Sequence, residues 1–443
     1  MHRKIGQFIY PWGGGHYSRM MKLDRALAAR MGEDADRMEV HYSSGGRIYQ
    51  RLLERFPDKA DRIHHVSMPT PIDGGMGPSL SKSLANVLFP VSGNPTLITQ
   101  IADYMRREGR LYDEQGFDLV INDGDMGSNV LAKNRNVPCL FVTNQFRPRL
   151  YRSRAYLYPA LLFISKQIAK ASKILVADSP PPHTICEYNL NFTDEILQEK
   201  VEYVGHFTDD VKKRPASCDA VAGEEAAAEA AGSSSSSSSS FRGADPDLKR
   251  LLESGGAGFG YWMRTGDRST NDGTGRRYEE VFARSEMRGE RRLVSHARNE
   301  PGIDSVKDAD GNRYAIGEAA DRGIDWVQID VGFLSEPDKD LVLDMCGYAV
   351  INGSHTVMGE IMGGRAKPII GVPIYDEHTN NIRWADEHGL GVMANDAKRI
   401  ISAVRDIKQN ESAYADRLAE FSRNFNGRGA QNAAEIAAEM MKG

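Results

Sequence analysis

Apolar residues recur along the chain in two alternating patterns, short unbroken runs and longer stretches at helical spacing. The runs are rich in β-branched residues and bounded by glycine, which is typical of strands buried on both faces of a parallel sheet. Clear examples lie at 5–10, 117–123, 138–142 and 173–177 in the first half, and at 258–264, 292–296, 325–329, 348–351 and 368–373 in the second. The alternation predicts an α/β fold of two doubly wound, Rossmann-like domains.

A change of composition separates the two halves. From Arg214 to Asp245 the chain is dominated by Ala, Glu, Gly and Ser, with an unbroken serine run over 233–240. Such a segment cannot bury a core, so it predicts a flexible tether. We therefore expect one domain over residues 1–210, a linker over 211–246 and a second domain over 247–427. Residues 428–443 carry Ala, Ile and Met at helical spacing and predict a terminal helix.

The most informative stretch follows the apolar run at 348–351. A glycine-bearing turn, Asn-Gly-Ser-His-Thr at 352–356, leads into a helical pattern. The first N–H groups of a helix lack intrahelical partners, and the helix dipole adds partial positive charge there. Gly353 lets a ligand approach the backbone, while Ser354 and Thr356 offer hydroxyl groups. The turn therefore indicates an anion site, although an ordinary strand-to-helix turn with Glu360 on a solvated face fits the residues equally well.

This stretch resembles the donor-site signature of GT-B nucleotide-sugar glycosyltransferases, which include the UDP-glycosyltransferases and the peptidoglycan lipid-intermediate N-acetylglucosaminyltransferase. In that family a His-Gly-Gly-type turn holds the diphosphate, and a glutamate seven residues after the first glycine holds the ribose. Gly353 and Glu360 have this spacing, and a Gly-x-Pro and a proline-ended strand follow in the family, as Lys367-Pro368 and Gly371-Val372-Pro373 do here. The resemblance implies two domains facing across a cleft, with donor contacts from Asn352, Gly353, Ser354, His355, Thr356 and Glu360.

The family next has an acid–glutamine pair that touches the donor sugar. Counting back from Gly389-Leu390-Gly391 and Asn381 places this pair at Glu377 and His378. His378 stands where glutamine is usual, so the identity of the sugar stays open. The resemblance also implies that Gly266 faces the diphosphate, and that Phe333 lies in a loop around the nucleotide base.

The N-terminal half begins with a second strand–glycine loop–helix pattern, in which Gly13, Gly14 and Gly15 precede His16. The family has a similar Gly-His at this place, and in many members the histidine is the general base. A family aspartate at a strand end, which orients that histidine, corresponds to Asp123. The proline that usually follows three residues after the histidine is Arg19 here.

The segment Phe146–Lys173 has basic residues around an aromatic and aliphatic centre, with no acid. This pattern is typical of an interfacial surface that attracts anionic lipid. An amphipathic helix packed on the core with a solvated basic face is at least as compatible. The first interpretation predicts peripheral membrane contact and a lipid-linked acceptor.

Composition narrows the alternatives. The net charge of −5 gives no general reason to expect nucleic acid. The four cysteines are scattered, which favours a reducing cytoplasm, and the N-terminal pattern does not predict a signal peptide. We expect no cofactor beyond a UDP-sugar co-substrate and no metal, because a helix N-terminus can stabilise the leaving diphosphate.

The resemblance thus implies a metal-independent, inverting hexosyltransferase that moves a sugar from a UDP-sugar to an acceptor hydroxyl or phosphate. Two alternatives share the architecture, a UDP-sugar 2-epimerase-like enzyme and a nucleotide-sugar-binding subunit without activity.

Overall fold

The computed structural model describes residues 3–11, 14–70, 72, 79–150, 152–192, 198–208, 244–264, 268–296 and 303–442. Most of the predicted linker, together with Gly13 and Gly266, lies outside these residues.

Seven parallel strands form the N-terminal sheet, in the order β3-β2-β1-β4-β5-β6-β7. They are β1 (Arg3–Ile9), β2 (Met38–Ser44), β3 (Ile63–His65), β4 (Leu119–Asp123), β5 (Cys139–Thr143), β6 (Lys173–Val176) and β7 (Val201–Tyr203). The strand order reverses between β1 and β4, and in open α/β sheets ligands bind at the carboxyl ends of the strands at such a point. Ile9 is paired with Asp123 at that edge.

The N-terminal helices are α1 (Gly14–Met31), α2 (Gly46–Arg55), α3 (Leu80–Leu88), α4 (Leu97–Gln115), α5 (Met126–Asn134), α6 (Tyr158–Ile168) and α7 (Glu187–Leu190). The sequence predicted a long acceptor-side loop over 69–95, and within the described part of that range this is wrong. Its second half forms α3, whose Ser79 side chain accepts the backbone N–H of Lys82. Apolar spacing at Leu80, Leu84 and Leu88 fits a helix, but its neighbouring Gly, Pro and Ser residues masked that signal.

Eight strands form the C-terminal sheet, in the order β11-β10-β12-β9-β8-β13-β14-β15. They are β8 (Gly260–Arg264), β9 (Arg292–His296), β10 (Ser305–Asp308), β11 (Arg313–Ala315), β12 (Trp326–Val331), β13 (Tyr348–Ile351), β14 (Ile369–Gly371) and β15 (Gly391–Met393). All neighbours are parallel except β10, which runs antiparallel to β11 and β12. The hairpin of β10 and β11 was not predicted from the sequence. Asp308 closes the turn by accepting the N–H groups of Asp310 and Asn312.

The C-terminal helices are α9 (Pro246–Gly255), α10 (Arg268–Phe282), α11 (Ile316–Arg322), α12 (Glu336–Met345), α13 (His355–Met358), α14 (Asp376–Glu387), α15 (Ala397–Gln409), α16 (Glu411–Asn424) and α17 (Gly429–Met440). A π-helical turn over Gly359–Gly364 continues α13. The two-domain α/β class predicted from the sequence is confirmed.

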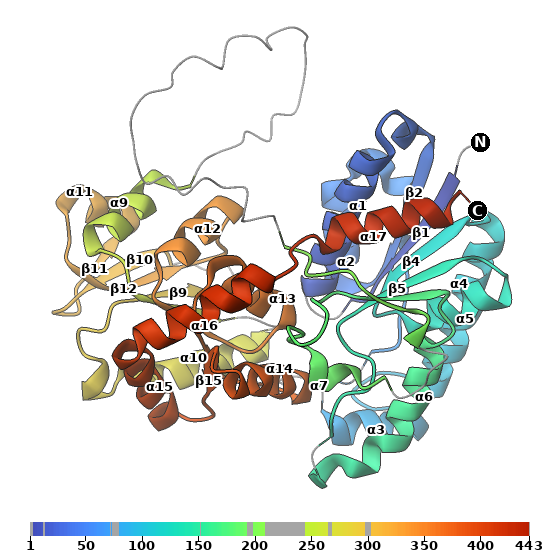
Figure 1. Ribbon diagram of the computed structural model, residues 1–443. Coiled ribbons are helices and arrows are strands. Elements are labelled where there is room, and N and C mark those ends of the chain that lie inside the picture. The colour runs from blue at the N-terminus through green and yellow to red at the C-terminus, as the bar shows by residue number, and fades with distance from the viewer. Residues whose placement is uncertain are drawn as a thin grey trace, which may run out of the picture.

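The last helix, α17, leaves the C-terminal half and lies beside α1 (Figure 1). Its buried face is almost entirely alanine, and Ala433, Ala434 and Ala437 are fully buried in the same cluster as Leu23 and Leu27 of α1. Small side chains let the two helices approach closely. The chain therefore ties its end to the domain in which it began.

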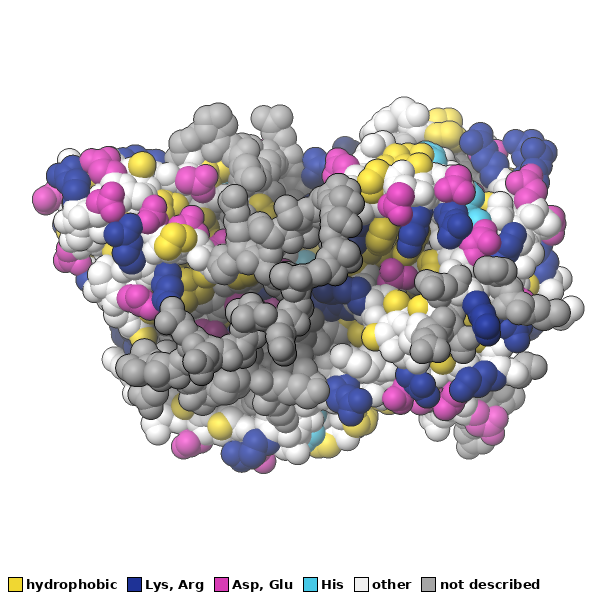
Figure 2. Space-filling view, turned by 90° about the horizontal axis from the view of Figure 1, so that it is seen from above, with side chains coloured by type: hydrophobic (Ala, Val, Ile, Leu, Met, Phe, Trp, Pro, Cys, Tyr) yellow, Lys and Arg dark blue, Asp and Glu magenta, His cyan; other side chains and the backbone are white. Residues whose placement is uncertain are grey.

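Acidic and basic side chains are interspersed on the upper face wherever it is described (Figure 2). Among the described residues, no helix is long and apolar enough to cross a bilayer.

Candidate functional site

The predicted donor turn has the geometry of a backbone anion site. Gly353 has φ of 92°, and a Cβ there would lie 2.6 Å from Ile382 Cδ1 and 2.9 Å from the His378 carbonyl oxygen. Both constraints require glycine. Asn352 Oδ1 accepts the N–H of Ser354 at 3.1 Å, and the Ser354 side chain does not cap the helix that begins after it. Within the described part of the chain, no side chain caps the first turn of α13.

The predicted base and its aspartate meet at the switch point of the N-terminal sheet. His16 Nδ1 lies 2.6 Å from Asp123 Oδ1. Arg19 adds a two-point contact, with Nε 2.7 Å from Asp123 Oδ2 and Nη2 2.8 Å from Oδ1. Asp123 is fully buried, which by itself would raise its pKa, but Arg19 and His16 outweigh burial and lower the pKa to about 2. The carboxylate is therefore ionised throughout the physiological range.

The N-terminal loop and the donor turn approach each other across the domain boundary. Arg19 Nη1 lies 3.4 Å from Thr356 Oγ1, a contact between residues 337 positions apart. A Cβ at Gly15 would lie 3.6 Å from the same hydroxyl. Gly14 begins α1 one residue earlier. The two glycine turns predicted from sequence thus lie at one place.

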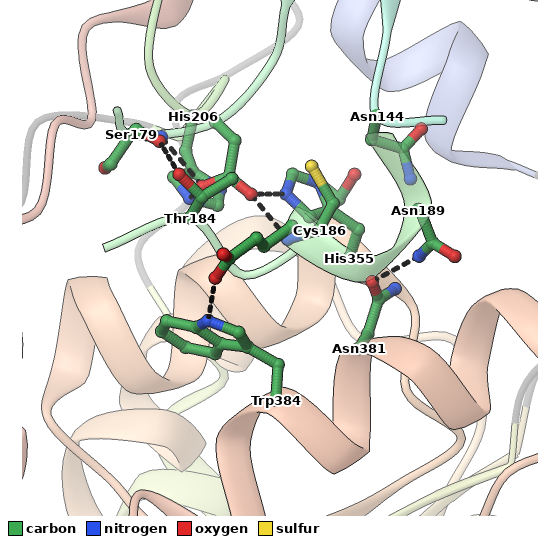
Figure 3. A network of polar contacts seen from close by, with 12 residues as sticks. Asn144, Ser179, Thr184, Cys186, Asn189, His206, His355, Asn381 and Trp384 are labelled. Atoms are coloured by element: carbon green, nitrogen blue, oxygen red, sulfur yellow. Dashed lines mark hydrogen bonds and ion pairs between the residues drawn. The ribbon is translucent and has the colours of Figure 1, made fainter. Parts of the chain in front are cut away.

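The side chain of His355, a predicted donor residue, points to the N-terminal half of the chain. It is buried, and its Nε2 lies 2.8 Å from Oδ2 of Asp178, a residue of the N-terminal half. His206 Nε2 lies 2.6 Å from the other oxygen, and the two imidazoles stack (Figure 3). Burial is the main reason that the pKa of His355 is lowered. His355 therefore holds the donor turn against the other domain, and only its backbone remains to meet a ligand.

The Asp178–His206–His355 group is, in the described part of the chain, a set of three side chains close enough to hold a metal ion. The Asp178 oxygens also accept the backbone N–H groups of Ser179 and Cys186, at 2.7 and 2.8 Å. The Asp178 carboxylate therefore contacts two imidazoles and two backbone N–H groups. We interpret the three side chains as a structural polar cluster.

The sequence also contains Asp-x-Asp at 123–125, a pattern that can hold a metal ion. Asp125 instead caps α5 and accepts the hydroxyl of Tyr104 at 2.5 Å. Asp123 is engaged by Arg19, so both carboxylates already have partners within the protein.

The residues assigned to the donor sugar also lie at the domain boundary. Asn144 Nδ2 donates to Glu377 Oε1 at 2.7 Å, and burial raises the pKa of Glu377. Asn381 accepts from Asn189 at 2.8 Å (Figure 3). It also donates to the carbonyl of Gly353 at 3.1 Å, so it braces the donor turn. Both polar ends of Asn381 are therefore engaged within the protein.

His378 is buried and lies against the ring of Tyr375, with centroids 3.8 Å apart. Burial lowers its pKa to about 3, so this histidine is neutral at physiological pH.

Glu360 and Phe333, two further predicted donor residues, are at least partly exposed. Glu360 forms an ion pair with Lys339 of α12 at 2.7 Å, and its side chain keeps 22% of its exposure. Phe333 is 71% exposed. Gly13 and Gly266 lie outside the described residues.

Sequence reasoning missed Asp178, His206 and Asn189, and recorded Arg19 only as a departure from the family. Asp178 and His206 follow the apolar strands at 173–177 and 201–205, which is the same strand-end signal that identified Asp123. Asn189 lies in α7 and had no such signal.

Comparison with known proteins agrees with this architecture. No family model matches the sequence. An uncharacterized glycosyltransferase from Methanosarcina mazei is 28% identical over 212 residues, covering 46% of this chain and 50% of the relative. The chain therefore spans about half the length of the curated relative that it matches.

Solved structures also resemble the whole chain, and two of them show the range. A UDP-glucosyltransferase from Polygonum tinctorium, capable of glucosylating indoxyl, aligns with a TM-score of 0.61 at 11% identity, over 100% of this chain and 99% of that one. A putative UDP-N-acetylglucosamine 2-epimerase from Listeria monocytogenes aligns with a TM-score of 0.52 at 12% identity, over 99% and 96%. The chain has the GT-B fold of nucleotide-sugar glycosyltransferases.

We expect His378 to make stability depend on pH. Its pKa is about 3 in the folded protein and about 6.5 when unfolded, so its contribution is complete above pH 6.5 and declines as pH falls toward 3. Between pH 7.5 and 5, the wild type should lose about 2 kcal/mol more than His378→Gln. Denaturant unfolding followed through tryptophan fluorescence would measure this, since Trp262, Trp326 and Trp384 lie in the C-terminal domain. His65→Gln, at an exposed position, serves as the control, and equal losses in wild type and His378→Gln would contradict the prediction.

Proposed function

We propose that the protein transfers a sugar from a UDP-sugar to an acceptor held by its N-terminal half. The observation that carries the proposal is the meeting of the His16–Asp123 pair with the uncapped start of α13 across the domain boundary. One side supplies a base and the other supplies backbone donors for a leaving diphosphate.

The proposed chemistry divides between the two domains. His16 removes the proton of an acceptor hydroxyl, and a positioned base of this kind typically contributes ~10²–10⁴ in rate. The N–H groups after Gly353 stabilise the departing diphosphate, so that no metal ion is required for that charge. Attack from the His16 side, opposite the diphosphate, inverts the anomeric centre. A hexose is the sugar class that the family resemblance favours.

Release of free UDP from UDP-sugars, with and without candidate acceptors, tests this function. Acceptor-dependent release indicates transfer, sugar interconversion without release indicates an epimerase, and binding alone indicates a non-catalytic subunit. We expect His16→Gln to lower turnover at least 100-fold with nearly unchanged UDP affinity, because the base acts on the acceptor. The matched control is His65→Gln at an exposed position. A loss of only a few-fold in folded His16→Gln would assign the base elsewhere.

Glu360 is the proposed ribose ligand. Glu360→Ala should weaken UDP binding by about 1.5–3 kcal/mol, because it removes hydrogen bonds from sugar hydroxyls to a charged acceptor. Titration calorimetry measures this loss. Lys339→Met removes the ion-pair partner but keeps the carboxylate, so it should change UDP affinity much less. Equal affinity in wild type and folded Glu360→Ala would exclude the assignment.

For the acceptor, we propose a lipid-linked molecule at the surface of an anionic bilayer. Large apolar side chains are exposed on α3, on α4 and around α6, namely Leu84, Leu88, Phe89, Ile98, Ile101, Tyr156, Tyr158 and Phe163. Helices α3 and α6 lie at the same end of the N-terminal half (Figure 1). Neither helix contains an acid, while Lys82 and Lys166 are exposed on them. Exposed apolar side chains beside lysines, on helices that contain no acidic residue, suit an anionic lipid surface.

The basic residues of 146–173 contribute less than the sequence suggested. Arg147 turns inward to Ser165 at 3.3 Å, and Lys173 pairs with Glu202 at 3.1 Å. Phe146 is buried rather than available to lipid. The side chains of Arg152 and Arg154 lie outside the described residues. The proposed membrane contact therefore rests more on the apolar helix faces than on charge.

The protein should sediment with anionic liposomes at low salt and less at high salt, where charge attraction is screened. Replacing Leu88, Phe89 and Phe163 together by serine should abolish sedimentation, because these three side chains are at least 60% exposed and would enter the interface.

Lys166→Ser should weaken binding at low salt, whereas Lys398→Ser, an exposed lysine of the other domain, should not. Donor hydrolysis should be unchanged in all of these variants. If wild type does not sediment with anionic liposomes at low salt, a soluble acceptor replaces the lipid-linked one.

A further inference from the structure

Neither the fold nor apolar packing explains why the arginine side chain at position 19 is buried. Arg19 is on α1, its side chain is 4% exposed, and it has no apolar role at that depth. All three of its guanidinium nitrogens contact other side chains, two at Asp123 and one at Thr356. A buried guanidinium is costly unless it is paired, so this arrangement requires the Asp123 carboxylate.

The geometry fixes which nitrogen of His16 carries the proton. Nδ1 lies 2.6 Å from Asp123 Oδ1 and 3.1 Å from Arg19 Nη2. A guanidinium only donates, and an ionised carboxylate only accepts. The shorter contact to Asp123 therefore needs a proton on Nδ1, and the neutral ring then has its lone pair on Nε2. This is the tautomer that a base requires.

Charge balance around His16 depends on Arg19. The ring, 24% exposed, is faced by Asp123 from β4, by Tyr10 after β1 at 5.6 Å, and electrostatically by Glu377 from α14. Asp123 and Glu377 are carboxyl groups, whereas burial raises the pKa of the Tyr10 phenol and keeps it uncharged. Among the described residues, Arg19 is a cation in contact with the ring. An aspartate without this cation would favour the protonated, charged imidazolium.

We propose that Arg19 is a positioning residue for His16: it neutralises Asp123 so that His16 remains an uncharged Nδ1–H base, and through Thr356 it ties this pair to the donor turn. The inference rests on the proposed function for its catalytic meaning, but the protonation state of His16 can be measured without activity.

The test compares wild type with Arg19→Lys and Arg19→Gln, using nitrogen-15-labelled histidine and NMR, with His16→Gln identifying the His16 signals. Wild type should show the Nδ1–H tautomer of neutral His16. In Arg19→Gln the His16–Asp123 pair should take up its proton about one pH unit higher, because the carboxylate loses its compensating cation. Arg19→Lys keeps the charge and should stay within a few tenths of a unit of wild type.

Kinetics provide the second readout where UDP release is observed. The acidic limb of kcat/KM should move upward by the same unit in Arg19→Gln, while UDP affinity changes less than three-fold. An unchanged His16 titration in folded Arg19→Gln would overturn the proposal. A tenfold loss of UDP affinity with an unchanged titration would instead make Arg19 a phosphate ligand. If no UDP is released by wild type, the proposed function fails, yet the NMR result still decides the role of Arg19.

Discussion

The carboxylate of Asp178 holds the two domains in register at the donor turn. It is fully buried, which by itself would raise its pKa. His206 and His355 outweigh burial and lower the pKa below its ordinary value. Two backbone N–H groups, from Ser179 and Cys186, complete its set of partners. A buried charge is tolerated only when its partners are complete, and removing one partner leaves a costly uncompensated group. Since His355 is the first residue of α13, the start of that helix stays where Asp178 places it.

Hydrogen bonds of α14 side chains add to the contact between the two domains. Asn189 of α7 donates to Asn381, which in turn donates to the Gly353 carbonyl, and the Trp384 indole donates to Glu187 at 3.2 Å. The position of the donor turn therefore depends on side chains from both domains. These contacts hold the turn in place without a ligand. Its backbone N–H groups would therefore be preorganised for a ligand rather than ordered by its binding.

Local sequence patterns could predict the strands and the glycine turns, because both rest on periodicity and on glycine positions, whereas the pairing of His16 with Asp123 was predicted from the resemblance to the family. They could not predict that the His355 side chain would contact Asp178. Its neighbours in sequence form an anion-binding turn, but its partner Asp178 lies 177 residues away in the other domain. Which strand-end acid meets which histidine depends on how the two sheets are placed, and periodicity carries no information about that placement. The same limit applies to Asn381, whose spacing suggested a sugar contact while its amide braces Gly353.

The charges at the domain boundary also constrain what can bind there. Asp123 and Asp178 are both ionised, and a diphosphate would bring further negative charge toward them. Imidazoles and N–H groups enclose Asp178, whereas Arg19 neutralises Asp123 by a two-point contact. Charge-assisted pairs of this kind are strong in a low-dielectric interior. An anion that bound beside the turn at 352–356 would therefore meet a neutral Arg19–Asp123 pair rather than a bare carboxylate. Under the proposed function, this compensation makes an acid-oriented base compatible with a nearby diphosphate.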